Sequence, residues 1–189
     1  MSKPNLSHKF GKGLPPKEFI ASMTKNQSEF QANYDSFVWA SEEDREFFES
    51  LNYRDDLRVL ILAVDWCGDV VRNIPVVFQA LEISGIPTEV LIMENHPDVM
   101  DEFLTMGGRS VPIVIVADTG GHVLGQWGPR PQHVQEVMVE FKRLNPDREA
   151  ADYQDNMAEA RKEIMKRYGE GTESHAVIIR ELRELISGF

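Results

Sequence analysis

The chain has a single cysteine, Cys67, so no disulfide can form within it. No run approaches the roughly 20 apolar residues of a membrane span, and residues 1–6 lack the apolar stretch of a signal peptide. Basic residues are the minority: 20 Lys and Arg stand against 31 Asp and Glu, for a net charge of −11. The single cysteine argues against a secreted protein stabilised by disulfides. The negative charge argues against binding to nucleic acid or to anionic membranes. Together these features predict a cytoplasmic protein.

Histidine and lysine are too scattered to form a site of their own. The five histidines have no close Cys or His partner in the sequence, so we expect no metal site and no cofactor. Several basic residues lie near the N-terminus, where they alternate with Gly and Pro and form no block. We interpret them as a solvated tail rather than a nucleic-acid-binding arm: Lys3, His8, Lys9, Lys12 and Lys17.

Apolar patterning predicts the order of the central elements. Residues 57–64 are nearly all apolar, as in a strand buried on both faces. Further strands are predicted at 88–93, 112–117 and 122–126, and helices at 68–83, 98–105 and 132–144. The order β-α-β-α-β-β-α combines a parallel crossover with an antiparallel hairpin. It therefore predicts an α/β fold with a mixed sheet and helices on its faces.

Both ends add helices to this core. Apolar residues from 19 to 37 recur at helical spacing with a break at 24–28, which predicts two short helices. Ser41 followed by three acids predicts the start of another. After 145–147 the chain becomes highly charged, and a last helix begins near Thr172 or Ser174. Its apolar stripe, within residues 172–187, is expected to dock on the core or on a partner, such as a second copy in a homodimer.

Several motifs in order resemble the thioredoxin family over residues 35–144. Trp66-Cys67-Gly68 is similar to the start of the family's Trp-Cys-Gly-Pro-Cys site, and Val111-Pro112 is similar to its cis-proline dipeptide. Pro75 and Gly128 also fall at family positions. The resemblance implies a thioredoxin fold over 35–145, an N-terminal tail and helical extension over 1–34, and a C-terminal helical extension over 146–189.

The sequence departs from the family at two positions. The second active-site cysteine is replaced by Val70, and the acid expected six residues before Cys67 is replaced by Ile61. In the family both contribute to resolving a mixed disulfide, so the resemblance implies that this step is missing. It also implies that Cys67 is the attacking thiol. By the same resemblance the substrate-binding residues are Trp66, Gly68, Asp69, Val111 and Pro112.

The reactivity of Cys67 depends on opposing charges. A helix N-terminus lowers the pKa of a thiol, whereas the carboxylate of Asp69 raises it. Arg72 points away from Cys67 on a helix and is expected to pair with Asp69 instead. Asp65 is expected to be a solvated loop residue, and the rings of Trp66 and Trp127 to flank the site, although core packing fits Trp127 equally. We therefore expect a thiol less acidic than in the most reactive family members.

Three functional hypotheses remain open. In the first, Cys67 exchanges with protein or peptide disulfides and a low-molecular-weight thiol resolves the intermediate. This hypothesis predicts that Cys67 titrates below a free thiol. In the second, the chain is a redox-inactive module that binds a peptide or protein partner beside Pro112. In the third, Cys67 senses oxidants by forming an intermolecular disulfide. The first is preferred by a narrow margin.

Overall fold

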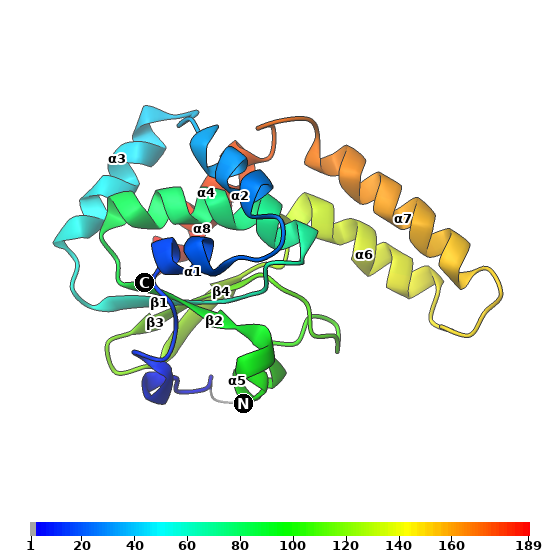
Figure 1. Cartoon of the computed structure of the whole chain (residues 1–189), viewed down its shortest axis with the longest axis horizontal. Coiled ribbons are helices and arrows are strands. Elements are labelled where there is room, and N and C mark those ends of the chain that lie inside the picture. The colour runs from blue at the N-terminus through cyan, green and yellow to red at the C-terminus, as the bar shows by residue number, and fades with distance from the viewer. Residues whose placement is uncertain (1–2) are drawn as a thin grey trace.

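A four-stranded mixed sheet forms the centre of the computed structural model, which describes residues 3–189 (Figure 1). Strands β1 (Leu57–Ala63), β2 (Thr88–Ile92), β3 (Ile113–Asp118) and β4 (Val123–Trp127) lie in the order β2-β1-β3-β4. β1 pairs in parallel with β2 and antiparallel with β3, which pairs antiparallel with β4. The predicted fold class, crossover and hairpin are confirmed.

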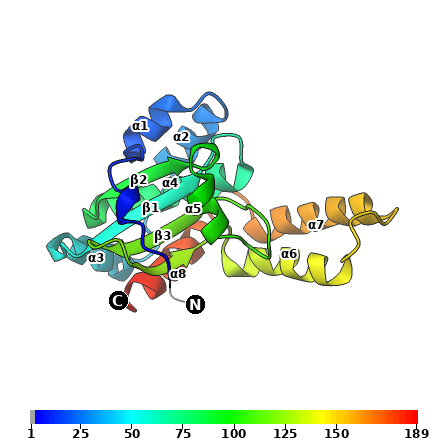
Figure 2. The same ribbon diagram turned by 90° about the horizontal axis from the view of Figure 1, so that it is seen from below.

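Helices cover both faces of the sheet (Figures 1 and 2). The long helix α4 (Gly68–Ser84) crosses one face together with α2 (Gln27–Asp35), α3 (Glu42–Ser50) and α8 (His175–Ile186). The short α5 (Pro97–Glu102) lies on the opposite face. The remaining elements are α1 (Pro16–Ser22), α6 (Gln132–Leu144), α7 (Tyr153–Tyr168) and three single-turn 3₁₀ helices at Ser7–Lys9, Leu51–Tyr53 and Met93–Asn95.

Local sequence signals explain most element ends. Ser41 begins α3 as predicted, because its hydroxyl accepts the amide N–H of Asp44 at 3.2 Å. The predicted helix over 98–105 is too long, since α5 ends at Glu102. Beyond it Met106 and Gly107 both have positive φ angles, of 50° and 75°, which a right-handed helix does not allow. Residues 103–108 therefore form a turn.

The N-terminal segment packs on the body. Leu6 is buried, Leu14 pairs with Val90 of β2, and the ammonium of Lys9 lies 2.7 Å from the carboxylate of Asp98. The prediction of a solvated tail is therefore wrong for Lys9. The N-terminal segment also reaches the opposite edge of the sheet, where Asn5 forms a β-bridge with His122, just before β4.

The apolar stripe of α8 is buried within the chain. Four side chains join the same core as the sheet and are at most 3% exposed: Ile178, Ile179, Leu182 and Ile186. Of the two predicted alternatives, docking of the stripe on the core is the one that this structure contains. Ser174 precedes the helix, but its side chain makes no capping hydrogen bond.

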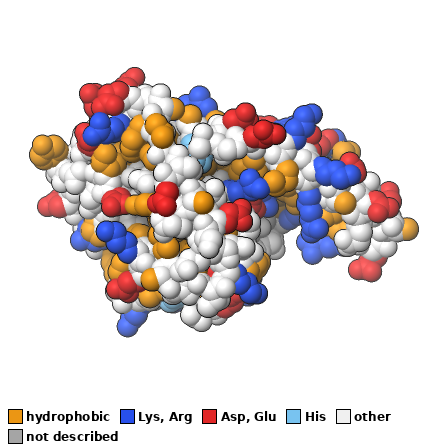
Figure 3. Space-filling view, turned by 45° about the horizontal axis from the view of Figure 1, so that its top comes forward, with side chains coloured by type: hydrophobic (Ala, Val, Ile, Leu, Met, Phe, Trp, Pro, Cys, Tyr) orange, Lys and Arg blue, Asp and Glu red, His pale blue; other side chains and the backbone are white. Residues whose placement is uncertain are grey.

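Helices α6 and α7 form an antiparallel arm that projects from the body (Figures 1 and 2). The arm has a small apolar cluster of its own, made by Val134, Val137, Ile164 and Tyr168. Acidic and basic side chains are interspersed over its surface in Figure 3. The arm is attached to the body beside the N-terminus of α4, which is where Cys67 lies.

Candidate functional site

Cys67 occupies the junction between β1 and α4. It is the N-cap residue of α4 with extended backbone angles, and its side chain is partly exposed. The thiol donates to the carbonyl oxygen of Val111 at 3.5 Å, and the Val111–Pro112 peptide bond is cis. The structure thus brings Cys67, Val111 and Pro112 together from segments 44 residues apart.

Gly128 lets the end of β4 approach this dipeptide. Its φ of +113° is unfavourable for other residues, and a Cβ there would overlap the carbonyl oxygen of Pro112. Gly68, on the other side of Cys67, is exposed, and a Cβ built on it meets no atom within 4 Å. The surface beside the thiol is therefore unobstructed at Gly68.

The protonation of Cys67 differs from what the exchange hypothesis predicts. Burial raises the pKa of the thiol, and the nearby charge of Asp69 raises it further. The amide N–H groups of Val70 and Asp69 and the guanidinium of Arg130 act in the opposite direction without offsetting burial. The prediction of a pKa below that of a free thiol is wrong, because the side chain is too buried for the helix terminus to dominate.

Asp69 pairs with Arg130 and not with Arg72 as predicted. A guanidinium nitrogen of Arg130 lies 2.7 Å from one carboxylate oxygen of Asp69, and both side chains are largely buried. The hydroxyl of Tyr168 donates to the other oxygen at 2.8 Å. Arg72 instead places its guanidinium 5.5 Å from the ring centre of Tyr168. Arg130, from the loop between β4 and α6, and Tyr168, from the arm, thus bind Asp69 in place of Arg72 on the same helix.

A buried asparagine completes this polar cluster. The side-chain amide of Asn73 donates to the hydroxyl of Tyr168 at 2.9 Å and to the carbonyl of Pro129 at 3.2 Å. Burial, reinforced by the charge of Asp69, raises the pKa of Tyr168, so the phenol stays protonated and can donate. Sequence reasoning missed Asn73, Arg130 and Tyr168, because no spacing relative to Cys67 distinguishes them.

Removing the phenol hydroxyl tests this cluster. We expect Tyr168→Phe to lower the free energy of unfolding by about 1–2 kcal/mol, because it removes the partner that Asp69 and Asn73 share in a buried site. Tyr153→Phe is the matched control on the same helix, since the ring of Tyr153 packs on Phe141 while its hydroxyl has no recorded partner among the described residues. Urea unfolding measures both. Equal stability of the two variants would contradict the role of the hydroxyl.

Asp65 fastens the N-terminal extension to the site. One of its carboxylate oxygens accepts the N–H and hydroxyl of Thr24, at 2.8 and 3.1 Å, and the N–H of Lys25 at 3.0 Å. Asn26, with a φ of 57°, donates to the Asp65 carbonyl. Although partial burial opposes ionisation, the bonds from Thr24 and Lys25 lower the pKa of Asp65. The prediction of a merely solvated Asp65 is wrong.

The two positions at which the family's second cysteine and acid are replaced carry apolar, fully buried side chains. Val70 and Ile61 are both 0% exposed and belong to the main core. Neither residue carries a group that can accept a proton or attack a disulfide. Within residues 3–189 no three His, Cys, Asp or Glu side chains gather as a set able to hold a metal ion.

Three exposed apolar side chains belong to the loops that carry Cys67 and precede Val111. Trp66 is 51% exposed, and its indole N–H donates to Glu94 at 2.9 Å. Leu104 and Met106 are exposed in the turn between α5 and β3, which sequence reasoning did not single out. Trp127 is a core residue rather than a wall of the site, since it is buried and donates to Glu181 at 2.6 Å.

Comparison with known proteins agrees with this geometry. A family model described as Thioredoxin matches residues 13–153. The chain belongs to the thioredoxin-like family. No curated protein matches it significantly. None of the helices in residues 3–189 combines the length and apolar character that crossing a membrane requires.

Two solved structures share the fold of this thioredoxin-like protein over nearly its whole length. One is an HIV epitope-scaffold, with a TM-score of 0.66 and 18% identity, covering 98% of this chain and 99% of the scaffold. The other is a protein of unknown function from Pseudomonas aeruginosa, with a TM-score of 0.62 and 16% identity, covering 98% of both chains. At these identities the likeness concerns the fold alone.

Proposed function

We propose that this thioredoxin-like protein is a slow monothiol thiol–disulfide exchanger that acts through Cys67. The contact between the Cys67 thiol and the carbonyl of Val111, beside the cis bond to Pro112, carries the proposal. An extended peptide could pair with the backbone of Val111 while its sulfur meets Cys67. Trp66 and the open surface at Gly68 would contact the rest of the substrate, and the largely buried Asp69 would act through its charge on Cys67.

The exchange needs two steps and one external thiol. The Cys67 thiolate attacks one sulfur of a disulfide, the old S–S bond breaks, and the leaving thiolate takes a proton from water. A low-molecular-weight thiolate then attacks the substrate sulfur of the mixed disulfide and releases the Cys67 thiolate. Val70 cannot supply this second attack. A reducing compartment such as the cytoplasm would provide the external thiol.

The reaction is tested with oxidised glutathione as the disulfide. We expect intact mass spectrometry to show one glutathionyl group per chain, and added reduced glutathione to remove it. Cys67→Ser is the control and should stay unmodified. A folded wild-type protein that takes up no glutathionyl group would refute the exchange function. Reduction of insulin should be slow, and rapid turnover would contradict the need for an external thiol.

The pH dependence follows from the burial of the thiol. Because burial raises the pKa of Cys67, only a small thiolate fraction exists at neutral pH. The alkylation rate should rise about tenfold per pH unit and should level off only above the value of a free thiol, about 8.5. Iodoacetamide labelling between about pH 6 and about pH 10, with N-acetylcysteine as reference, measures this. A plateau below that reference would contradict the effect of burial.

A redox-inactive binding module is the second candidate, and the raised pKa of Cys67 favours it. In that case the surface beside Pro112 would bind a peptide without bond exchange. Cys67→Ser would then preserve binding of a protein partner, whereas exchange requires the sulfur. The two candidates are separated by whether the glutathionyl adduct forms.

A further inference from the structure

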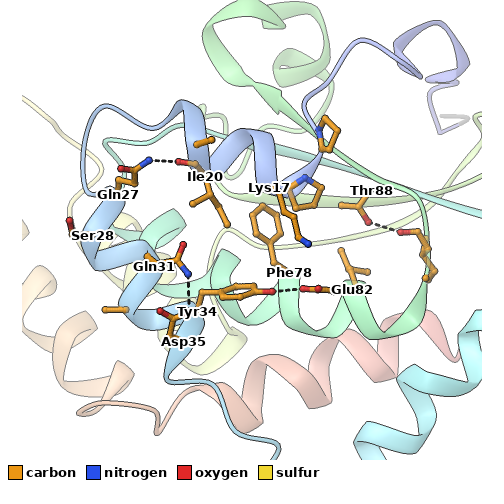
Figure 4. A pocket seen from close by; sticks show the side chains of 17 residues that line it. Lys17, Ile20, Gln27, Ser28, Gln31, Tyr34, Asp35, Phe78, Glu82 and Thr88 are labelled. Atoms are coloured by element: carbon orange, nitrogen blue, oxygen red, sulfur yellow. Dashed lines mark hydrogen bonds between the residues drawn. The ribbon is translucent and has the colours of Figure 1, made fainter.

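A second site lies between α1, α2 and the C-terminal half of α4, away from the thiol (Figure 4). It is an open pocket of about 1120 Å³, and neither Cys67 nor its neighbours in sequence line it. This volume is slightly above the range of typical small-molecule sites, roughly 300–1,000 Å³. The pocket exists because the N-terminal extension adds two helices over α4.

The floor of the pocket is apolar and rigid. Phe78 lies at the bottom and packs against Phe19 and Phe30, with ring centres 6.2 and 5.7 Å away. Such edge-on and tilted contacts fix the ring without a ligand. The other main apolar walls are Pro15, Pro16, Ile20, Leu81 and Ile86. A ligand would therefore meet a preformed hydrophobic surface.

Most polar groups of the wall are already paired with each other, as Figure 4 shows. Gln27 donates to the carbonyl of Ile20 at 2.7 Å and Gln31 to Asp35 at 2.8 Å. Thr88 donates to the carbonyl of Ile86. Tyr34 donates to Glu82, and burial followed by this bond raises the pKa of Tyr34 to about 12. These side chains have few hydrogen bonds left for a polar ligand.

Lys17 and Ser28 are exceptions in the wall, and Lys17 is the one that carries a charge. No hydrogen bond or ion pair is recorded for its ammonium within residues 3–189, and Figure 4 shows it extending into the pocket near Phe78. An ammonium without a partner can donate to an acceptor on a ligand. The two carboxylates of the wall, Asp35 and Glu82, disfavour a ligand that is itself an anion, as does the net charge of −11.

We propose that this pocket binds a neutral, mainly apolar small molecule that presents one hydrogen-bond acceptor to Lys17. The apolar floor holds the body of the ligand, and Lys17 orients its polar end. This site is independent of the exchange chemistry at Cys67. Its occupant differs in kind from a disulfide substrate, because nothing in the wall can react with sulfur.

The neutral dye Prodan, which carries a single carbonyl on an aromatic body, is a suitable probe. We expect saturable binding to one site of the full chain, with a blue shift of the dye emission. Ala32→Trp should weaken binding at least about tenfold, because Ala32 is an exposed residue of the wall and the new ring fills the pocket. Ala158→Trp, at an exposed position of α7, is the matched control and should bind as the wild type does.

Lys17→Met tests the polar end separately. It keeps most of the side-chain length and removes the donor, so Prodan should bind about three- to tenfold more weakly. Absence of saturable binding to the wild type, or equal binding by Ala32→Trp, would overturn the site. Tighter binding of the anionic dye anilinonaphthalene sulfonate than of Prodan would overturn the assignment of a neutral ligand. Unchanged affinity in Lys17→Met would overturn the role of the ammonium.

Discussion

Replacing Asp69 by asparagine should lower the pKa of Cys67. The substitution removes a negative charge that opposes the thiolate and frees Arg130, whose positive charge favours it. The thiolate fraction at neutral pH would then rise. Because a less basic thiolate is also a weaker nucleophile, the alkylation rate should increase by a smaller factor than the thiolate fraction does. The pH profile of iodoacetamide labelling measures the shift directly.

Arg130→Gln provides the control of opposite sign. It keeps a polar side chain but removes the charge that lowers the pKa of Cys67, so the labelling rate at neutral pH should fall. Asp155→Asn, on the exposed surface of the arm, should leave the profile unchanged. If Asp69→Asn and Arg130→Gln moved the profile in the same direction, the change would reflect disturbed packing. That outcome would contradict control of the Cys67 reactivity by the charges of Asp69 and Arg130.

Truncating Leu182 to alanine should lower the free energy of unfolding by about 2–5 kcal/mol. Leu182 is 1% exposed and packs in the same core as the sheet, so its removal leaves a cavity that the surrounding strands cannot fill. Leu144→Ala is the matched control, because Leu144 is 61% exposed at the end of α6 and its truncation should cost little. Urea denaturation compares the two.

The outcome decides what the C-terminal helix does. A loss below about 1 kcal/mol in Leu182→Ala would mean that α8 detaches easily and that its stripe is free for another partner. The expected large loss would mean that α8 is part of the folded core. The arm would then be a long insertion between β4 and this helix.

The two carboxylates that flank Cys67 hold the added segments of the fold. Asp65 binds the turn between α1 and α2, and Asp69 binds Arg130 and Tyr168. The loop that carries the thiol is thus fastened on both sides. A change in either added segment should therefore alter the surroundings of Cys67.

Much of this arrangement could be predicted from local pattern. The apolar run at 57–64 predicted a buried strand, and Gln132–Leu144 has the predicted helix bounds. The motif residues Cys67 and Pro112 were recognised because their order along the chain is typical of the family. The partner of Asp69 was predicted wrongly, since helical spacing favours Arg72 while Arg130 and Tyr168 approach from other elements.

The sequence by itself determined the order of strands and helices, the single thiol at a helix start, and the lack of a second thiol at Val70. These features depend on neighbouring residues and on residue type. Only the tertiary structure decided the burial of the thiol, the partners of Asp69 and the docking of α8. Each of these depends on contacts between segments that are far apart in the sequence. Asp69 and Tyr168, for example, are 99 residues apart, and their spacing does not predict that they meet.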